Sequence, residues 1–147
     1  MSANPATGGS TIRSIAAVVV SYLIFAITGV ALFALRGKDP HLPPGLAFAL
    51  SSITCGTAAA CAAGYSAALI ARRRPVLHAV IVAGIIAAGA TSSIIAQPDT
   101  SHWSQLAALG VMAPAAIVGG WLRARGMGTA PVGFSSNSDK RQGSGSA

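Results

Sequence analysis

Residues 45–75 read GLAFALSSITCGTAAACAAGYSAALIARRRP, a stretch that is uncharged from residue 45 to residue 71 and is closed by three arginines and a proline. Because an α-helix rises about 1.5 Å per residue, roughly 20 apolar residues cross a hydrocarbon core about 30 Å thick. More than half of the uncharged part is Gly, Ala or Ser, so it is only weakly hydrophobic and suits the centre of a bundle. The stretch therefore predicts a transmembrane helix surrounded by other helices.

Three further stretches have the same length and lack of charge. The four predicted spans cover residues 14–35, 45–71, 76–96 and 103–122. The whole chain is 52% apolar and 9% charged, against about 25% charged in an ordinary soluble domain. The short connections between the last three spans make neighbouring helices antiparallel. We therefore predict an all-α integral membrane four-helix bundle over residues 14–122.

The distribution of basic residues predicts the orientation, because Lys and Arg in short loops stay on the cytoplasmic side. Of the ten basic residues, Arg36 and Lys38 fall on one side. The other eight fall on the opposite side: Arg13, Arg72, Arg73, Arg74, Arg123, Arg125, Lys140 and Arg141. Both termini are therefore predicted to be cytoplasmic, with an N-terminal tail over residues 1–13 and a flexible basic tail over residues 123–147. Within these tails, residues 1–11 and 126–147 are predicted to be disordered. The trio 72–74 fixes topology and could also bind anionic lipid headgroups.

The first span has an alternative interpretation as a secretory signal peptide. Its apolar run is longer than the roughly 7 to 15 residues of a signal-peptide core, so we interpret it as a retained helix. In the fourth span, Pro114 is expected to kink the helix. Trp103 and Trp121 are expected to mark the two membrane interfaces.

Small residues four positions apart are typical of helix contact faces in membranes, because they let two backbones approach closely. The predicted helix-packing residues are Ser52, Gly56, Ala60, Gly64 and Ala68 in the second span, Gly84, Ala88 and Ser92 in the third, and Ala116 and Gly120 in the fourth. One interpretation is that these stripes join the four helices of one chain. The other is that one stripe contacts a second copy or a partner.

Candidate chemistry is sparse, since Glu is absent and the predicted spans contain no charged residue. Ion-coupled transporters usually carry an ionisable side chain at membrane depth, so the small multidrug exporters, which depend on a membrane-embedded Glu, do not match. Cys55 and Cys61 lie on different faces of one helix and are interpreted as packing residues. His78 is interpreted as an interfacial histidine, with pigment or haem ligation as the alternative.

The predicted extracytoplasmic loops hold the remaining candidates. Asp39, His41, Asp99 and His102 include residue types that ligate zinc or copper. Ordinary solvated loops have a similar composition, so our expectation is no metal site and no cofactor. We likewise expect no nucleic-acid binding, because the basic residues are sparse and lack interleaved aromatic residues.

The segments GYSAALIARRRPVLHA (residues 64–79) and GGWLR (residues 119–123) resemble the uncharacterised small four-helix membrane proteins of bacteria. This resemblance implies a four-span architecture in a bacterial inner membrane and implies no activity. We expect a non-enzymatic structural or accessory component that packs with itself or with a larger membrane complex. The alternative is a small homo-oligomeric channel or transporter for a neutral or lipophilic solute, with Ser51, Thr54, Thr57 and Tyr65 as its partial polar lining.

Overall fold

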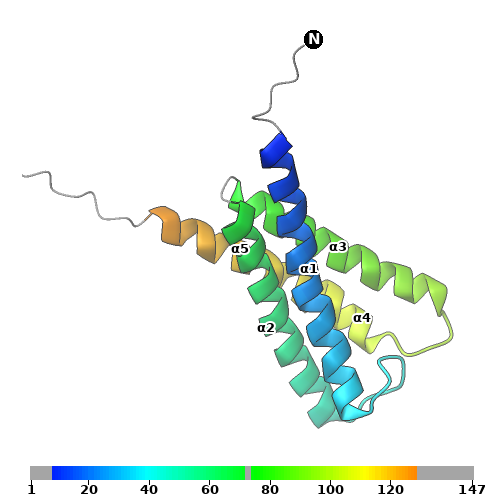
Figure 1. The fold of residues 1–147 in the computed structure, drawn as a ribbon. Helices are drawn as coiled ribbons and strands as arrows, with labels where there is room; N and C mark the ends of the chain where they lie inside the picture. The colour runs from blue at the N-terminus through cyan, green and yellow to red at the C-terminus, as the bar shows by residue number, and fades with distance from the viewer. Residues whose placement is uncertain (1–7, 72–73, 129–147) are drawn as a thin grey trace, which may run out of the picture.

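The structure, a computed structural model, describes residues 8–71 and 74–128. Its helices are α1 (Gly8–Arg36), α2 (Leu46–Ala71), α3 (Pro75–Ala96), α4 (Trp103–Ala107), the π-helical segment η1 (Ala108–Met112) and α5 (Ala113–Gly128). The last three follow one another without a break and form a single long helix (Figure 1). The all-helical fold is thus confirmed, and four helices at the positions of the predicted spans are long and apolar enough to cross a membrane.

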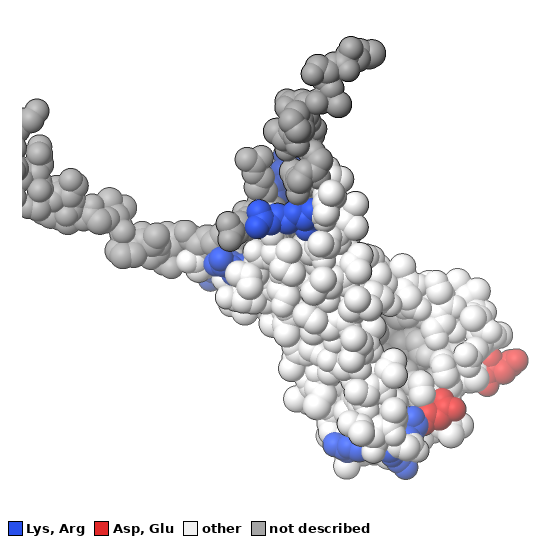
Figure 2. All heavy atoms as spheres, in the orientation of Figure 1, with Lys and Arg blue, Asp and Glu red and all other residues white. Residues whose placement is uncertain are grey.

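The charged residues of the described chain lie at the two ends of the bundle. The start of α1, the turn between α2 and α3, and the end of α5 lie at one end, which we call the turn end (Figure 1). The α1–α2 loop and the α3–α4 loop lie at the other, which we call the loop end. Blue and red atoms appear at these ends, and the surface between them is white (Figure 2). An uncharged band between charged ends is the surface that a multi-pass membrane protein presents to lipid.

Two helices are longer than the sequence predicted. The first begins at Gly8 and the last continues to Gly128, so residues 8–11 and 126–128, which were predicted to be disordered, are helical. Near a membrane interface a helix keeps its backbone hydrogen bonds even after its apolar run has ended. The guanidinium carbon of Arg125 also lies 3.5 Å from the centre of the Trp121 ring, a cation–π contact that holds the last turns together. The rest of both predicted tails lies outside the described residues.

The core of the bundle is built from alanines where α2, α3 and α5 meet. Ala60, Ala63 and Ala67 from α2 pack with Val82, Ala83 and Ile86 from α3 and with Ala113 and Ala116 from α5. Because these side chains are short, the helix backbones approach closely. By contrast, α1 packs on the outside of this core and is the least buried of the four spans. Only two of its described side chains, Ala17 and Ser21, are buried.

The fourth span changes from α-helical to π-helical hydrogen bonding just before Pro114. The N–H of Ala113 donates to the carbonyl of Ala108, five residues earlier, which is the π-helical pattern. Pro114 follows directly, and it has no N–H to donate to the preceding turn. A proline and a π-helical turn are both common causes of local distortion in a helix. The distortion expected at Pro114 is therefore present as a π-helical turn just before the proline.

Candidate functional site

The two loops at the loop end are bonded to each other. The N–H of Ser101 donates to the carbonyl of His41 over 3.0 Å. The indole Nε1 of Trp103 donates to the carbonyl of Leu42 over 3.1 Å. The sequence left open whether these loops meet, and the structure shows that they form one unit beside the start of α4.

A buried amide joins this unit to the helices. Gln105 on α4 is only 6% exposed. Its Nε2 lies 3.1 Å from Ser93 Oγ on α3 and 3.2 Å from Nδ1 of His41 in the α1–α2 loop. Its Oε1 accepts a hydrogen bond of 2.9 Å from Ser104 Oγ, which also lies 3.0 Å from the carbonyl of Pro40. Interhelical bonds of this kind stabilise helix association in membranes, so Gln105 connects three parts of the chain.

The four metal candidates are not assembled into a ligand set. Within residues 8–71 and 74–128, no group of three or more His, Cys, Asp or Glu side chains is placed to hold a metal ion. Asp39 Oδ1 instead accepts the N–H of His41 over 2.8 Å. His102 Nε2 lies 3.3 Å from the carbonyl of Pro98, and Asp99 is exposed. Asp39 and His102 therefore bond the backbone of their own loops, and the ring of His41 bonds Gln105 on α4.

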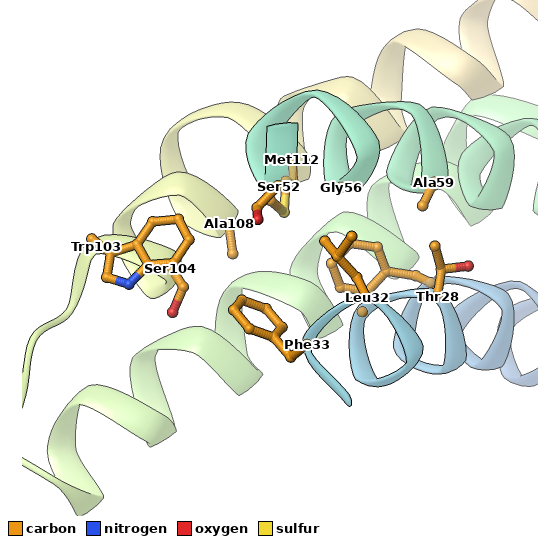
Figure 3. Close-up of a pocket in the computed structure, with 12 residues that line it drawn as sticks. Thr28, Leu32, Phe33, Ser52, Gly56, Ala59, Trp103, Ser104, Ala108 and Met112 are labelled. Carbon is orange, nitrogen blue, oxygen red and sulfur yellow. The ribbon is translucent and has the colours of Figure 1, made fainter. Parts of the chain in front are cut away.

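Beneath the loops, three aromatic rings pack together, and two of them, Phe33 and Trp103, line a small cavity. Phe33 from α1, Phe48 from α2 and Trp103 from α4 have ring centroids 5.7 to 6.1 Å apart. The cavity has a volume of about 140 Å³ and lies between α1, α2 and the fourth span (Figure 3). Its walls are almost entirely apolar: Phe25, Thr28, Gly29, Leu32, Phe33, Ser52, Gly56, Ala59, Trp103, Ser104, Ala108 and Met112. Trp103, expected only as an interfacial anchor, therefore also caps this cavity.

One hydroxyl in the cavity wall has no partner. Ser52 is 3% exposed, and its buried Oγ makes no hydrogen bond. Other serines and threonines of the spans donate to carbonyls three or four residues earlier in their own helix, among them Thr28, Ser51, Thr54, Thr57, Thr91 and Ser92. Ser51 donates to the carbonyl of Phe48, which is the acceptor four residues before Ser52. The proposed channel-lining hydroxyls at 51, 54 and 57 thus bond their own backbone, and Tyr65 is exposed.

The small residues of α2 lie in the closest helix contact of the molecule. A Cβ on Gly64 would overlap the backbone of Ala116, and one on Gly119 would overlap the backbone of Cys61. Ser52, Ala60 and Ala68 on the same helix are buried, as is Ala116 on α5. A Cβ on Gly56 would meet the side chain of Met112, and one on Gly120 the side chain of Ala79. This stripe therefore joins α2 to α5, and α5 to α3, within one chain.

The corresponding stripe of α3 faces outward. Gly84, Ala88 and Ser92 are all exposed, and a Cβ on Gly84 would meet nothing within 4 Å. The buried face of α3 consists instead of His78, Ala79, Val82, Ala83, Ile86 and Ala90. The exposed side chains of Ile81 and Ile95 lie at the two ends of the stripe. For α3, the interpretation that the stripe joins helices of the same chain does not hold, because the stripe contacts none of the described helices.

At the turn end, Arg74 directly precedes α3 and has a left-handed backbone conformation, with φ of 50° and ψ of 57°. The carbonyl of Arg74 accepts the backbone N–H of Leu77, and Nδ1 of His78 lies 3.2 Å from the same oxygen. His78 is therefore a buried residue that contacts the backbone of the residue before α3. Arg72 and Arg73 lie outside the described residues, and the side chain of Arg74 is exposed.

Comparison with known proteins identified no relative: no family model, curated protein or solved structure matches this sequence. The geometry of the molecule is therefore the evidence for its function.

Gln105 was not predicted from the sequence as a functional residue, and Ser52 was predicted only as a helix-packing residue. The signal for Gln105 was present, since an amide within an uncharged span needs a hydrogen-bond partner. Nothing in the sequence distinguishes Ser52 from the other hydroxyls of the spans.

Proposed function

We propose that this protein is a non-enzymatic, multi-pass component of a bacterial inner membrane. In this proposal it acts as a structural or accessory subunit that packs against a transmembrane helix of a second copy or of a larger membrane complex. The observation that carries the proposal is the outward stripe of α3, where Gly84, Ala88 and Ser92 leave a shallow, small-residue face. Another helix could approach this face closely, because close approach and van der Waals contact drive helix association in lipid.

The polar groups of the spans support a structural role over a catalytic one. Six serine and threonine hydroxyls of the spans donate to their own helix, and Gln105 joins α4 to α3 and to the α1–α2 loop. The bonds of Gln105 hold separate parts of the bundle together, and the bonds within helices occupy hydroxyls that substrate chemistry would need. These bonded polar groups therefore fit a helix bundle whose outer surface contacts lipid and neighbouring helices.

We further propose that the turn end faces the cytoplasm. The described cations Arg13, Arg74, Arg123 and Arg125 belong to this end, whereas Arg36 and Lys38 belong to the loop end (Figure 2). An excess of basic residues on one side is the usual determinant of orientation. The arginines at 72–74 would then lie beside anionic headgroups, each contributing about 1 kcal/mol of attraction near a negatively charged leaflet.

The test compares two substitutions that add the same side-chain bulk to two outward faces. Ala88→Leu blocks the stripe of α3, and Ala58→Leu enlarges an exposed position of α2. After extraction in mild detergent, the wild-type protein should migrate as an assembly. Ala88→Leu should weaken association at least tenfold, or about 1.4 kcal/mol, while Ala58→Leu should behave as wild type.

Both variants should keep the thermal stability of the wild-type bundle, because neither position is buried. The proposal fails if the wild-type protein is strictly monomeric and free of partners under these conditions. It also fails if Ala88→Leu associates as tightly as Ala58→Leu.

A further inference from the structure

We propose that the cavity beneath Trp103 is a binding site for one uncharged, ring-sized apolar molecule that carries a hydroxyl group, of the class of simple phenols and cyclic alcohols. The cavity volume of about 140 Å³ is close to that of engineered apolar cavities of about 150 Å³ that bind benzene. This inference goes beyond the proposed helix association and does not depend on it, because the cavity and the outer face of α3 share no residue.

We infer that the ligand carries a hydroxyl group because the hydroxyl of Ser52, in the cavity wall, has no hydrogen-bond partner. The Ser52 side chain is directed into the space between α1, α2 and α4 (Figure 3), where its oxygen is buried and has no partner. Unlike Ser51, which donates to the carbonyl of Phe48, Ser52 donates to no carbonyl of its own helix. A buried hydroxyl without a partner costs free energy. A ligand hydroxyl could remove that cost by donating to or accepting from Ser52, once the serine side chain turns so that its covered oxygen faces the ligand.

The rest of the lining limits the ligand to one polar group. Thr28 donates to the carbonyl of Ile24 over 2.7 Å, and Trp103 donates to the carbonyl of Leu42. The hydroxyl of Ser104 is shared between the carbonyl of Pro40 and the amide of Gln105. The remaining lining residues are apolar, and none of the twelve is charged. A charged or strongly polar ligand would therefore lose its hydration without compensation.

One wall of the cavity belongs to a helix that could move to admit a ligand. One side is formed by α1, the least buried span, through residues including Phe25, Gly29 and Leu32. The alanine core of α2, α3 and α5 does not have to open, because the close contacts of Gly64 and Gly119 belong to a different part of α2 and α5. A small molecule could enter from the membrane by displacing α1 alone.

The experiment is a titration of the full-length protein in lipid nanodiscs with 4-fluorophenol and, separately, with 4-fluorotoluene, followed by fluorine NMR. Empty nanodiscs of the same lipid give the background from partition into the bilayer. After this correction, both probes should bind the protein saturably. The phenol should bind about fivefold more tightly, the contribution expected of one net hydrogen bond.

Three variants identify the site. Ser52→Ala should bind both probes with equal affinity, because only the preference for the hydroxyl depends on Ser52. Gly29→Leu should abolish saturable binding of both, since its new side chain fills the cavity and its first carbon meets nothing within 4 Å. Ala58→Leu adds bulk outside the cavity and should bind as wild type.

Three outcomes overturn the proposal. The first is that neither probe binds above the nanodisc background, as when a lipid chain already fills the space. The second is that Gly29→Leu binds both probes as well as the wild-type protein does. The third is that the preference for the phenol survives in Ser52→Ala, which would place the probe elsewhere.

Discussion

Replacing Gly64 by Ala should separate α2 from α5 and destabilise the bundle. The new Cβ would lie 2.6 Å from the carbonyl carbon of Ala116 and 2.9 Å from its Cα, whereas carbon atoms in contact are about 3.5–4.0 Å apart. The Cβ would overlap the carbonyl oxygen of Ala116 still more closely, so the helices must move apart by more than about 1 Å, which costs neighbouring atom pairs about half of their dispersion energy. Overpacking of this kind lowers the free energy of unfolding by about 1–3 kcal/mol.

The assay is unfolding in mild detergent, by heat and by titration with a denaturing detergent, followed by near-ultraviolet circular dichroism. Gly84→Ala is the matched control, because its Cβ meets nothing within 4 Å on the outer face of α3. Since Ala is a better helix former than Gly, the control should be unchanged or more stable by up to about 1 kcal/mol. Equal effects of the two substitutions, or an unchanged Gly64→Ala, would refute the close contact as the source of stability.

Three other substitutions test separate parts of the structure by the same unfolding assay. Ser52→Ala should raise the free energy of unfolding by about 1 kcal/mol, because it removes a buried hydroxyl without a partner; destabilisation would mean that the hydroxyl is bonded. Gln105→Leu should lower it by about 1–2 kcal/mol through lost interhelical bonds, whereas Gln97→Leu at an exposed position should not. Arg74→Gly should leave stability unchanged or raise it by up to about 1 kcal/mol, because Gly adopts the left-handed conformation freely; a large loss would contradict the assigned turn.

The four helices could be predicted from the sequence because the membrane imposes a length and excludes charge. Residues 46–71 of the observed α2 fall within the predicted span of 45–71, and α3 begins at Pro75, where a proline is tolerated in the first turn. The ends of α1 and α5 were less predictable. Their outer turns are polar, and a polar helix that continues beyond the membrane has no hydropathy signal.

The direction in which each stripe faces could not be predicted. In a soluble protein an apolar stripe must face the core, but in lipid the inner and outer faces of a helix are both apolar. Gly64 and Gly84 therefore have the same sequence signature, although one lies against Ala116 and the other faces outward. Ser51 and Ser52 are adjacent and chemically identical, and spacing alone does not determine that only Ser51 bonds its own helix.

The most direct test of the account is site-specific photo-crosslinking at the outer face of α3 in intact membranes. A photoreactive amino acid is placed at position 88, with position 58 on α2 as the control, both being exposed in the isolated chain. The account predicts a protein adduct of defined mass from position 88, either a dimer of this chain or a complex with one other membrane protein, and only lipid adducts from position 58. Lipid adducts alone from position 88 would contradict the claim that α3 packs against another transmembrane helix.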